Sequence, residues 1–454
     1  MKKNKTILII LFYILIHCFF NLNAAEIINI PDEFLTFAKE ASNYEINEDN
    51  VINNLLYLEL KITDKSIIKQ TYNILGEILK RIKKDIKNNF TPKEKLIKIY
   101  DILKNDFKLN YNESSSDLFS KNLINKNIKC DTSSFIYLVI SQELNWPIYC
   151  MLLPNHMFIR WSDNLNEFNF ETTNSGIYKE EFYIKEYKIS DSNIIRFSEK
   201  ELIGYFYYKI GCVQYELNDY KDALINFNNA IELNKNCSNF YYNRGITKNK
   251  LKDYTSAIID FDSAIELYNN DYNIYFGRGN AKYEINDLYG AIKDYDRVIE
   301  LNNKFYEAFF NRGMIKSEIK DYSDAIDDFK KIIDINKNNF KIYFFLGNLY
   351  SEIKDYYSAI DNYTKALELN NKFLEGYYKR GIAKKEINYY YEAISDFDMA
   401  IGLDNTFADA YFEKGLLFYN LMKIEEAVNN FKKAVNINPD LMSIIPKEIK
   451  KKIK

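Results

Sequence analysis

The sequence predicts a mainly α-helical protein with two parts: an N-terminal α+β domain, and a right-handed α-solenoid of seven helix-turn-helix repeats. Three observations predict this fold class. Glycine and proline, which interrupt helices, number only 14 and 6 among 454 residues. The second half of the chain is periodic, with the same residue types at every 34th position. The first half has no period, but it contains short alternating segments that are typical of strands.

The N-terminal segment 1–25 has the features of a signal peptide. A positively charged start, "MKKNK", precedes an almost unbroken apolar run from 7 to 20, and the small residues "NAA" follow. This run is shorter than the ~18 residues that a membrane span needs. We therefore expect residues 1–25 to be cleaved and the mature chain to be exported to the periplasm or the extracellular space, without a membrane span. As an alternative, "LIHC" allows lipidation at Cys18.

Charge and cysteine content limit the function classes. The formal net charge is −3 and both signs are mixed along the chain, which argues against a nucleic-acid partner. Four cysteines follow the apolar run: Cys130, Cys150, Cys212 and Cys237. They are too few for a disulfide framework in so long a chain, and the sequence leaves their pairing open. Neither a metal-ligand cluster nor a glycine-rich phosphate loop is present, so we expect no metal and no cofactor. The oligomeric state is not indicated.

The periodic half has one glycine in each repeat, at a constant spacing. The series is Gly211, Gly245, Gly279, Gly313, Gly347, Gly381 and Gly415. An alanine stands at position +12 from each glycine, and a phenylalanine or tyrosine stands at position +16. This pattern is the signature of the tetratricopeptide repeat (TPR), and residues 204–441 resemble seven TPRs. The resemblance implies stacked pairs of antiparallel helices that recruit a protein or peptide partner, and we expect a capping helix over 442–454.

An aromatic residue stands three positions before each repeat glycine. These candidates for a protein-binding groove are Tyr208, Tyr242, Phe276, Phe310, Phe344, Tyr378 and Phe412. TPR families commonly place such residues toward the concave face, while packing between repeats is an equally good interpretation. Some TPRs clamp a C-terminal carboxylate with a lysine at this position. Because aromatic residues stand at this position in all seven repeats, we expect no such clamp.

Arginine and aspartate change together between repeats. Four repeats have arginine directly before the glycine and aspartate at position +15 after it, and the other three have asparagine at the second position. A basic series could bind an anionic ligand. The matched exchange instead predicts an ion pair between the two helices of a repeat, because a buried arginine without its carboxylate is costly. The predicted pairs are Arg244–Asp260, Arg278–Asp294, Arg312–Asp328 and Arg380–Asp396.

Residues 26–200 form the predicted N-terminal domain, helical at first and α+β in a core of about 95–185. Two capping boxes, "TPKE" at 91–94 and "SEKE" at 198–201, predict helix starts. The segment 130–145 has a helical pattern, and "MFIRW" and "EFNFET" alternate as strands do.

One cysteine, one histidine and one glutamate in this core form a candidate site. Cys130 begins the predicted helix, where the helix N-terminus favours a thiolate. His156 opens a strand, and a four-residue loop, "SDNL", pairs it with Glu171 across a hairpin. A thiolate, an imidazole and an orienting carboxylate together make a thiol triad.

This core resembles the transglutaminase-like branch of the papain-like thiol enzymes. The resemblance rests on "PNHMFIR" (154–160) and "NFETTNSG" (169–176), followed by TPRs. It implies that Cys130 is the nucleophile, His156 the general base and Glu171 the residue that orients it, although aspartate is more usual at the last position. It also implies a cysteine-dependent amide hydrolase or acyltransferase. The alternative is a non-catalytic TPR scaffold with a degenerate thiol domain, in which Cys130 is structural or disulfide-bonded to Cys150.

Overall fold

The computed structural model describes residues 55–56, 58–59, 63–112, 118–153, 156–187 and 195–453. The predicted signal peptide with Cys18, and Pro154 and Asn155 of the predicted strand motif, lie outside the described residues. The chain forms two compact units, Met1–Ala281 and Lys282–Lys454. Among the helices of the described part, none combines the length and the hydropathy that a membrane crossing requires.

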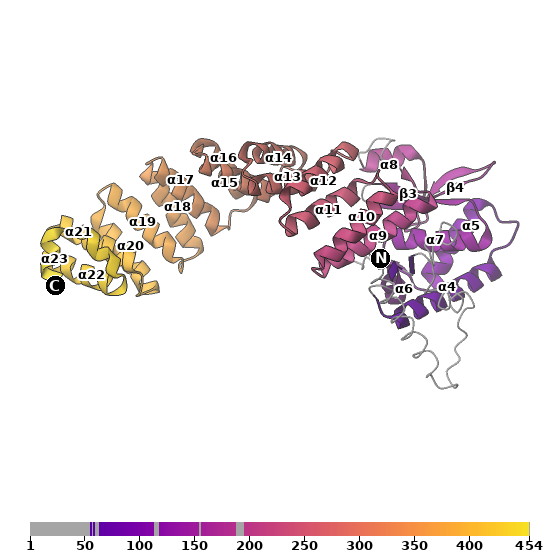
Figure 1. The fold of residues 1–454 in the computed structure, drawn as a ribbon, viewed down its shortest axis with the longest axis horizontal. Coiled ribbons are helices and arrows are strands. Elements are labelled where there is room, and N and C mark those ends of the chain that lie inside the picture. The colour runs from indigo at the N-terminus through magenta and orange to yellow at the C-terminus, as the bar shows by residue number, and fades with distance from the viewer. Residues whose placement is uncertain are drawn as a thin grey trace, which may run out of the picture. The chain divides into compact units, whose positions relative to one another are not determined.

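The described structure is mainly helical, which confirms the predicted fold class. A small α+β region comes first, and consecutive helix pairs follow it (Figure 1). The elements of the α+β region are α4 (Lys65–Asp85), α5 (Pro92–Asp101), the π-helical turn η1 (Ile102–Asp106), β1 (Asn110–Tyr111), α6 (Phe119–Asn125), β2 (Asn127–Ile128), α7 (Cys130–Leu144), β3 (Ile148–Leu153), β4 (His156–Ser162), β5 (Glu167–Phe170), β6 (Ile177–Tyr178), α8 (Glu180–Tyr187) and β7 (Ile195–Arg196).

Five strands form one antiparallel sheet in the order β6-β5-β4-β3-β7, with helices on both faces. On one face, Cys150 and Ile159 belong to the same buried core as the residues of α7. On the other face, Phe158 stacks on Tyr183 of α8, with 4.1 Å between the ring centroids. Successive side chains of a strand point to opposite faces, so β4 packs against α7 on one face of the sheet and against α8 on the other. The short strands β1 and β2 form a separate parallel pair.

The β4–β5 hairpin corrects the predicted register by two residues. Arg160 pairs with Asn169 and Ser162 pairs with Glu167, so the loop comprises 163–166 instead of 162–165. Because side chains alternate with a period of two, a shift of two keeps each residue on its predicted face. His156 and Glu171 therefore still share a face of the sheet, although Glu171 lies just beyond the end of β5 and not directly opposite His156.

Asp163 is the reason for this loop position. Its Oδ1 atom accepts hydrogen bonds from the backbone N–H groups of Leu165 and Asn166, at 2.8 and 2.6 Å. Its Oδ2 atom accepts from Trp161 Nε1 at 2.7 Å, and these bonds lower the pKa of Asp163 to about 2. An aspartate that binds the backbone two residues ahead starts a turn, so the chain reverses after Asp163 and not before it.

The predicted helix starts of this region are confirmed. Thr91 and Glu94 form a complete capping box at the start of α5, and Ser198 and Glu201 form another at the start of α9. The predicted helix over 130–145 is α7, which begins at Cys130 and ends where Asn145 adopts a left-handed conformation. Residues 131–141 of α7 are all buried, so this helix is the centre of the α+β core.

The first solenoid helix, α9 (Glu199–Glu216), belongs to this core as well. Phe206 packs edge-on against Phe135 of α7, with 5.1 Å between ring centroids, and Tyr205 contacts the same ring at 6.0 Å. The cluster of buried apolar residues runs without a break from Leu55 to Phe240. The α+β region and the beginning of the solenoid are thus stabilised by one continuous core.

Helix pairs of nearly constant length make up the rest of the chain, as the repeat pattern predicts. After α9 they are α10 (Tyr220–Leu233), α11 (Ser238–Lys250), α12 (Tyr254–Leu267), α13 (Tyr272–Glu284), α14 (Leu288–Leu301), α15 (Tyr306–Glu318), α16 (Tyr322–Ile335), α17 (Phe340–Glu352), α18 (Tyr356–Leu369), α19 (Leu374–Glu386), α20 (Tyr390–Leu403), α21 (Ala408–Asn420) and α22 (Ile424–Ile437). A 3₁₀ helix η3 (Pro439–Ile444) and α23 (Lys447–Ile453) close the chain.

The repeat glycines allow the two helices of a pair to touch. A methyl group added at Gly381 would lie 2.7 Å from the ring of Phe397, and one at Gly211 would lie equally close to Phe227. These aromatic residues are the ones at position +16 from the glycines, and their rings are fully buried. The small residue and the ring therefore form one packing unit in each of these repeats, which explains why neither varies freely.

The turn inside each repeat places a residue other than glycine in the left-handed region. These residues recur once per repeat: Asn218, Lys252, Asn286, Lys320, Lys354, Asn388 and Met422, with φ between 60° and 64°. A left-handed conformation costs residues with a Cβ about 1–2 kcal/mol. The packing of the flanking helices supplies this energy at every turn.

Three of the four predicted arginine–aspartate pairs are confirmed. In each, the guanidinium binds both carboxylate oxygens of the predicted aspartate, as in Arg380–Asp396 at 2.9 and 2.6 Å. The same geometry holds for Arg244–Asp260 and Arg312–Asp328. Arg278 and Asp294 lie in different units, and their pairing stays a prediction.

Each of these aspartates also binds a lysine that was not predicted. Lys384 lies 2.7 Å from the second oxygen of Asp396, four residues after the arginine on the same helix. The other end of the guanidinium reaches back to the preceding repeat, where Arg380 donates to Thr364 Oγ1 at 3.0 Å. The network thus joins the two helices of one repeat and links this repeat to the preceding one. The arginines that precede the repeat glycines therefore have a structural role.

Candidate active site

Cys130 differs from the buried cysteines in its surroundings. It is the first residue of α7 and is half-buried, and all four cysteines from Cys130 onward are free thiols. The alternative of a disulfide between Cys130 and Cys150 is therefore wrong. Burial raises the pKa of Cys150 well above its usual range and raises that of Cys237 to about 12, so both are held as neutral thiols.

The side chains of His156 and Glu171 meet in a short hydrogen bond. His156 Nε2 lies 2.6 Å from Glu171 Oε2, and the two side chains are 10% and 6% exposed. The other carboxylate oxygen, Oε1, accepts a hydrogen bond from Thr173 Oγ1 at 3.2 Å. Because Nε2 is used by Glu171, the second ring nitrogen, Nδ1, is the one left for Cys130.

His156 also forms a hydrogen bond with the side chain of Cys130, so the structure brings the three predicted site residues together. Burial disfavours the charged imidazole. The hydrogen bonds with Cys130 and Glu171 and the charges of both groups outweigh it, and they raise the pKa of His156 to about 9. At neutral pH the ring is therefore protonated, with Cys130 on one side and Glu171 on the other. An imidazolium between a thiol group and a carboxylate can hold a proton that it later delivers to a leaving group.

A tight turn over residues 171–176 holds the glutamate in place. The backbone N–H of Glu171 donates to the carbonyl of Gly176 at 2.8 Å, and Asn174 Oδ1 accepts from the Gly176 N–H at 2.8 Å. A Cβ at Gly176 would lie 2.2 Å from the ring of Tyr178, so a side chain at this position would have to displace that ring. Ser133 of α7 donates to the carbonyl of Thr172 at 3.0 Å, which ties the turn to the first turn of the cysteine helix.

The remaining residues of the two sequence motifs support this geometry. Asn169, which is 4% exposed, accepts a hydrogen bond from Arg160 Nε at 2.8 Å across the hairpin. Phe158, fully buried, fixes β4 against α8. Within these motifs only His156 and Glu171 had a predicted role. The supporting roles of Phe158 and Arg160 could have been predicted, because they alternate along β4 and therefore lie on the same face of the strand as His156.

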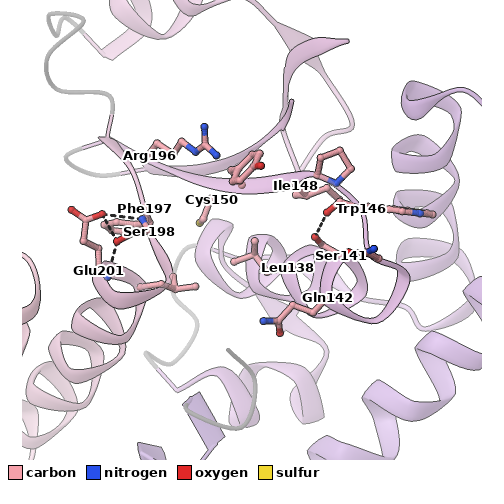
Figure 2. Close-up of a pocket in the computed structure, with 14 residues that line it drawn as sticks. Leu138, Ser141, Gln142, Trp146, Ile148, Cys150, Arg196, Phe197, Ser198 and Glu201 are labelled. Carbon is pink, nitrogen blue, oxygen red and sulfur yellow. Dashed lines mark hydrogen bonds between the residues drawn. The ribbon is translucent and has the colours of Figure 1, made fainter. Parts of the chain in front are cut away.

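Cavities are present in the described part of this domain, and a large one is not lined by any of the three site residues. It has a volume of about 550 Å³ and lies between the C-terminal half of α7, β3, β7 and the start of α9 (Figure 2). Leu138, Cys150 and Arg196 are among its lining residues, and none of the three site residues lines it. A smaller cavity of about 150 Å³ is bordered by Ser133, Thr172 and Thr173, so it adjoins the turn that carries Glu171.

Within the part of the chain that the structure describes, no group of three or more histidine, cysteine, aspartate and glutamate side chains is arranged to hold a metal ion. Cys130, His156 and Glu171 supply the groups for acid–base and nucleophilic chemistry.

The seven aromatic residues of the predicted groove lie between helices, and none is exposed. Several contact the following repeat: Tyr208 stacks on Phe240 at 4.9 Å, Phe344 packs against Phe373 at 4.8 Å and Tyr378 packs against Phe407 at 5.0 Å. Packing between repeats is therefore one of their functions. Their contribution to partner binding stays a prediction.

The comparisons with known proteins agree with this division of the chain. A family model described as the transglutaminase-like superfamily matches residues 69–188. Tetratricopeptide repeat models match residues 208–272, 306–339, 340–373 and 408–441. Among curated protein sequences, none matches the chain.

Several solved structures of TPR proteins are similar to part of this chain. MamA is 27% identical, with 36% of this chain and 96% of MamA covered and a TM-score of 0.35. YrrB, described as a TPR protein with an unusual peptide-binding site, is 26% identical, with coverage of 40% and 94% and a TM-score of 0.36. The C-terminal part of a TPR protein from Cytophaga hutchinsonii is 18% identical, with coverage of 54% and 99% and a TM-score of 0.48. The family models show that the chain carries a transglutaminase-like domain, matched at residues 69–188, followed by an array of tetratricopeptide repeats.

Proposed function

We propose that this chain is a thiol enzyme that hydrolyses or transfers the acyl group of a peptide or protein amide, and that its TPR array recruits the protein partner. The observation that supports this most directly is the position of the His156 ring, which is hydrogen-bonded to Cys130 on one side and to Glu171 on the other. A histidine that only stabilised the fold would not need a thiol partner at the N-terminus of a helix.

In the proposed reaction, the proton of the Cys130 thiol already resides on His156, and the Cys130 thiolate attacks the carbonyl carbon of the amide. A C–S bond forms, the C–N bond breaks, and the imidazolium gives its proton to the departing amine. Water or an amine then attacks the thioester, with the neutral imidazole accepting its proton, and Cys130 is released. Glu171 holds the ring orientation throughout and compensates its positive charge.

Export belongs to the same proposal. The N-terminal segment has the composition of a cleaved signal peptide. Purifying the protein from its native cells tests this point. Loss of the segment 1–25, measured by intact mass, supports export, and an intact N-terminus contradicts it.

A non-catalytic TPR scaffold is the second candidate, because the family match names repeats that serve protein binding. The two hypotheses differ in the behaviour of Cys130. In a scaffold its reactivity would match that of another half-buried cysteine, and Cys212 provides that comparison. In an enzyme, the thiolate paired with His156 reacts at acidic pH, where an ordinary thiol is protonated and inert.

The experiment is brief alkylation with iodoacetamide at pH 6, followed by mass spectrometry of each cysteine peptide. We expect Cys130 to be labelled at least about ten times faster than Cys212, as a ten-fold greater thiolate fraction requires. His156→Gln should remove this advantage, and Cys130→Ala should abolish hydrolysis while leaving the circular dichroism spectrum unchanged. Equal labelling of Cys130 and Cys212 in the wild-type protein would favour the scaffold.

A further inference from the structure

A buried ion pair connects the residue after Cys130 to the first TPR helix. Asp131 is 5% exposed, and its Oδ2 atom lies 3.0 Å from Lys209 Nζ and 3.4 Å from the hydroxyl of Tyr205. Its Oδ1 atom accepts a 2.6 Å hydrogen bond from the backbone N–H of Thr132. The carboxylate thus sits in the first turn of α7 and has its cation on a helix of the solenoid.

Lys209 is itself removed from water, because its side chain is only 11% exposed. Tyr205 and Lys209 are one helical turn apart on α9, so both project toward α7 from the same side of that helix. A lysine ammonium is rarely buried unless it is paired, and Asp131 is the partner that the fold provides.

A second buried acid, Glu59, is also influenced by the charge of Lys209. Its oxygens accept hydrogen bonds from the backbone N–H groups of Phe119 and Ser120 at the start of α6. Burial raises the pKa of Glu59 to about 7, although those hydrogen bonds and the charge of Lys209 lower it. The charge of Lys209 thus favours the ionised form of both buried acids.

The position of this pair beside the nucleophile gives it a chemical consequence. A thiolate on Cys130, the carboxylate of Asp131 and the carboxylate of Glu171 are three anionic groups, and two of them belong to adjacent residues. Like charges on neighbouring groups disfavour each other, and the burial of Asp131 and Glu171 strengthens this effect because water screens them less. His156 compensates the charges of Cys130 and Glu171, and Lys209 compensates that of Asp131.

We propose that Lys209 is a positioning residue of the candidate active site: from the first TPR helix, it neutralises and fixes Asp131, so that Cys130 can carry a thiolate. This inference rests on the proposed thiol function. It assigns to the solenoid a part in the chemistry itself, beyond the recruitment of a partner.

The experiment is the rate of Cys130 alkylation by iodoacetamide from pH 5 to 9, measured on the full chain with each cysteine quantified by mass spectrometry. In Lys209→Met the stem length is kept and the charge is lost. We expect labelling of Cys130 at pH 7 to slow by about ten-fold and its pH profile to move to higher pH. Lys209→Arg should retain the wild-type profile, and Lys200→Met, at an exposed position of the same helix, should not change it.

Asp131→Asn should change the alkylation rate of Cys130 in the opposite direction. With Lys209 present and the carboxylate gone, labelling of Cys130 at pH 5 should become several-fold faster than in the wild-type protein. The double variant Asp131→Asn with Lys209→Met should return to within about two-fold of the wild-type rate, since both charges are absent. This double variant and Asp131→Asn keep the test decisive if Lys209→Met does not fold.

The experiment distinguishes a failure of the proposed thiol function from a failure of the role proposed for Lys209. If wild-type Cys130 reacts no faster than Cys212 at acidic pH, the proposed thiol function fails. If wild-type Cys130 is activated, but neither Lys209→Met nor Asp131→Asn moves its pH profile, the role of Lys209 is overturned and the ion pair serves only to join α7 to α9.

Discussion

The solenoid and the α+β region bury charge in different ways. In the solenoid, Asp260, Asp328 and Asp396 are at most 3% exposed, and each receives a two-pronged arginine and a lysine. In the α+β region, Glu171 has a single histidine, and that histidine is shared with a thiol group. Arginine and lysine keep their charge throughout the physiological pH range, so they are permanent partners. A carboxylate whose partner can lose its proton belongs to a site that can move protons.

This difference shows what repetition conveys in a sequence. A network that recurs from one repeat to the next serves each repeat in the same way, so it stabilises the fold. A constellation that occurs once, between residues far apart in the chain, has no such general role. We therefore interpret the repeated charges as structural and the single Cys130–His156–Glu171 group as functional.

The largest effect on stability should follow the loss of one repeated carboxylate. Asp396→Ala leaves Arg380 and Lys384 buried without their partner, so we expect the free energy of unfolding to fall by about 3 kcal/mol. Urea unfolding followed by circular dichroism measures it. Asp398→Ala is the matched control, since Asp398 lies on the same helix and is about half exposed where it pairs with Lys414. It should cost less than about 1 kcal/mol.

Equal losses for the two alanine variants would show that the repeated network is not stabilising in its buried form. The double change Arg380→Leu with Asp396→Asn, which copies the fifth repeat at these two positions, should be better tolerated than Asp396→Ala alone, because Lys384 is then the one cation of this network left without its carboxylate instead of two.

The sequence predicted the solenoid more completely than the site. The glycine and its aromatic partner recur in all seven repeats, and arginine and aspartate are exchanged together between repeats, so both relations could be inferred within one chain. The lysine partners and the left-handed turn residues were missed, because lysine and asparagine at those positions look like ordinary surface residues. Their recurrence from repeat to repeat was the available signal.

For the site, the sequence predicted the three residues but not their exact pairing. The hairpin register was wrong by two residues because Asp163, and not Ser162, begins the turn through its hydrogen bonds to the backbone. The pairing of Asp131 with Lys209 could not be predicted, since it depends on how α9 packs against α7. No local pattern in a sequence specifies that contact.

We expect an intermediate effect on the free energy of unfolding from Glu171→Gln, which keeps the size of the side chain and removes its charge. The pKa of His156 should fall, because one of the two groups that raise it is lost. In the wild-type protein this pKa is raised from 6.5 to about 9, so the protonated ring contributes stability that is complete below pH 6.5 and is lost as the pH rises through 9. At pH 7 the variant should be less stable by about 1–2 kcal/mol, and above pH 9.5 the difference should narrow. Unfolding curves at pH 6, 7 and 9.5 measure this, and a difference that is constant across pH would contradict it.

The smallest effect on the free energy of unfolding should come from a substitution in a turn of the solenoid. Met422 is 82% exposed and has a φ of 60°, so Met422→Gly relieves a strained backbone without removing a packed side chain. We expect a gain of about 0.5–1 kcal/mol in the free energy of unfolding. Lys423→Gly, at the next position with a φ of −87°, should instead lower stability. A loss in both variants would show that the left-handed turns carry no strain.

The titration of His156 tests the central claim most directly. The chain has two histidines, His17 and His156, so the imidazole NMR signals of the full protein can be assigned with a His17→Gln variant. We expect the His156 ring to titrate near pH 9, and its midpoint to fall in Cys130→Ala, because the thiol group and Glu171 together hold the proton. A midpoint near 6.5 that does not change in Cys130→Ala would contradict the coupling of Cys130 to His156, and with it the assignment of this group as an active site.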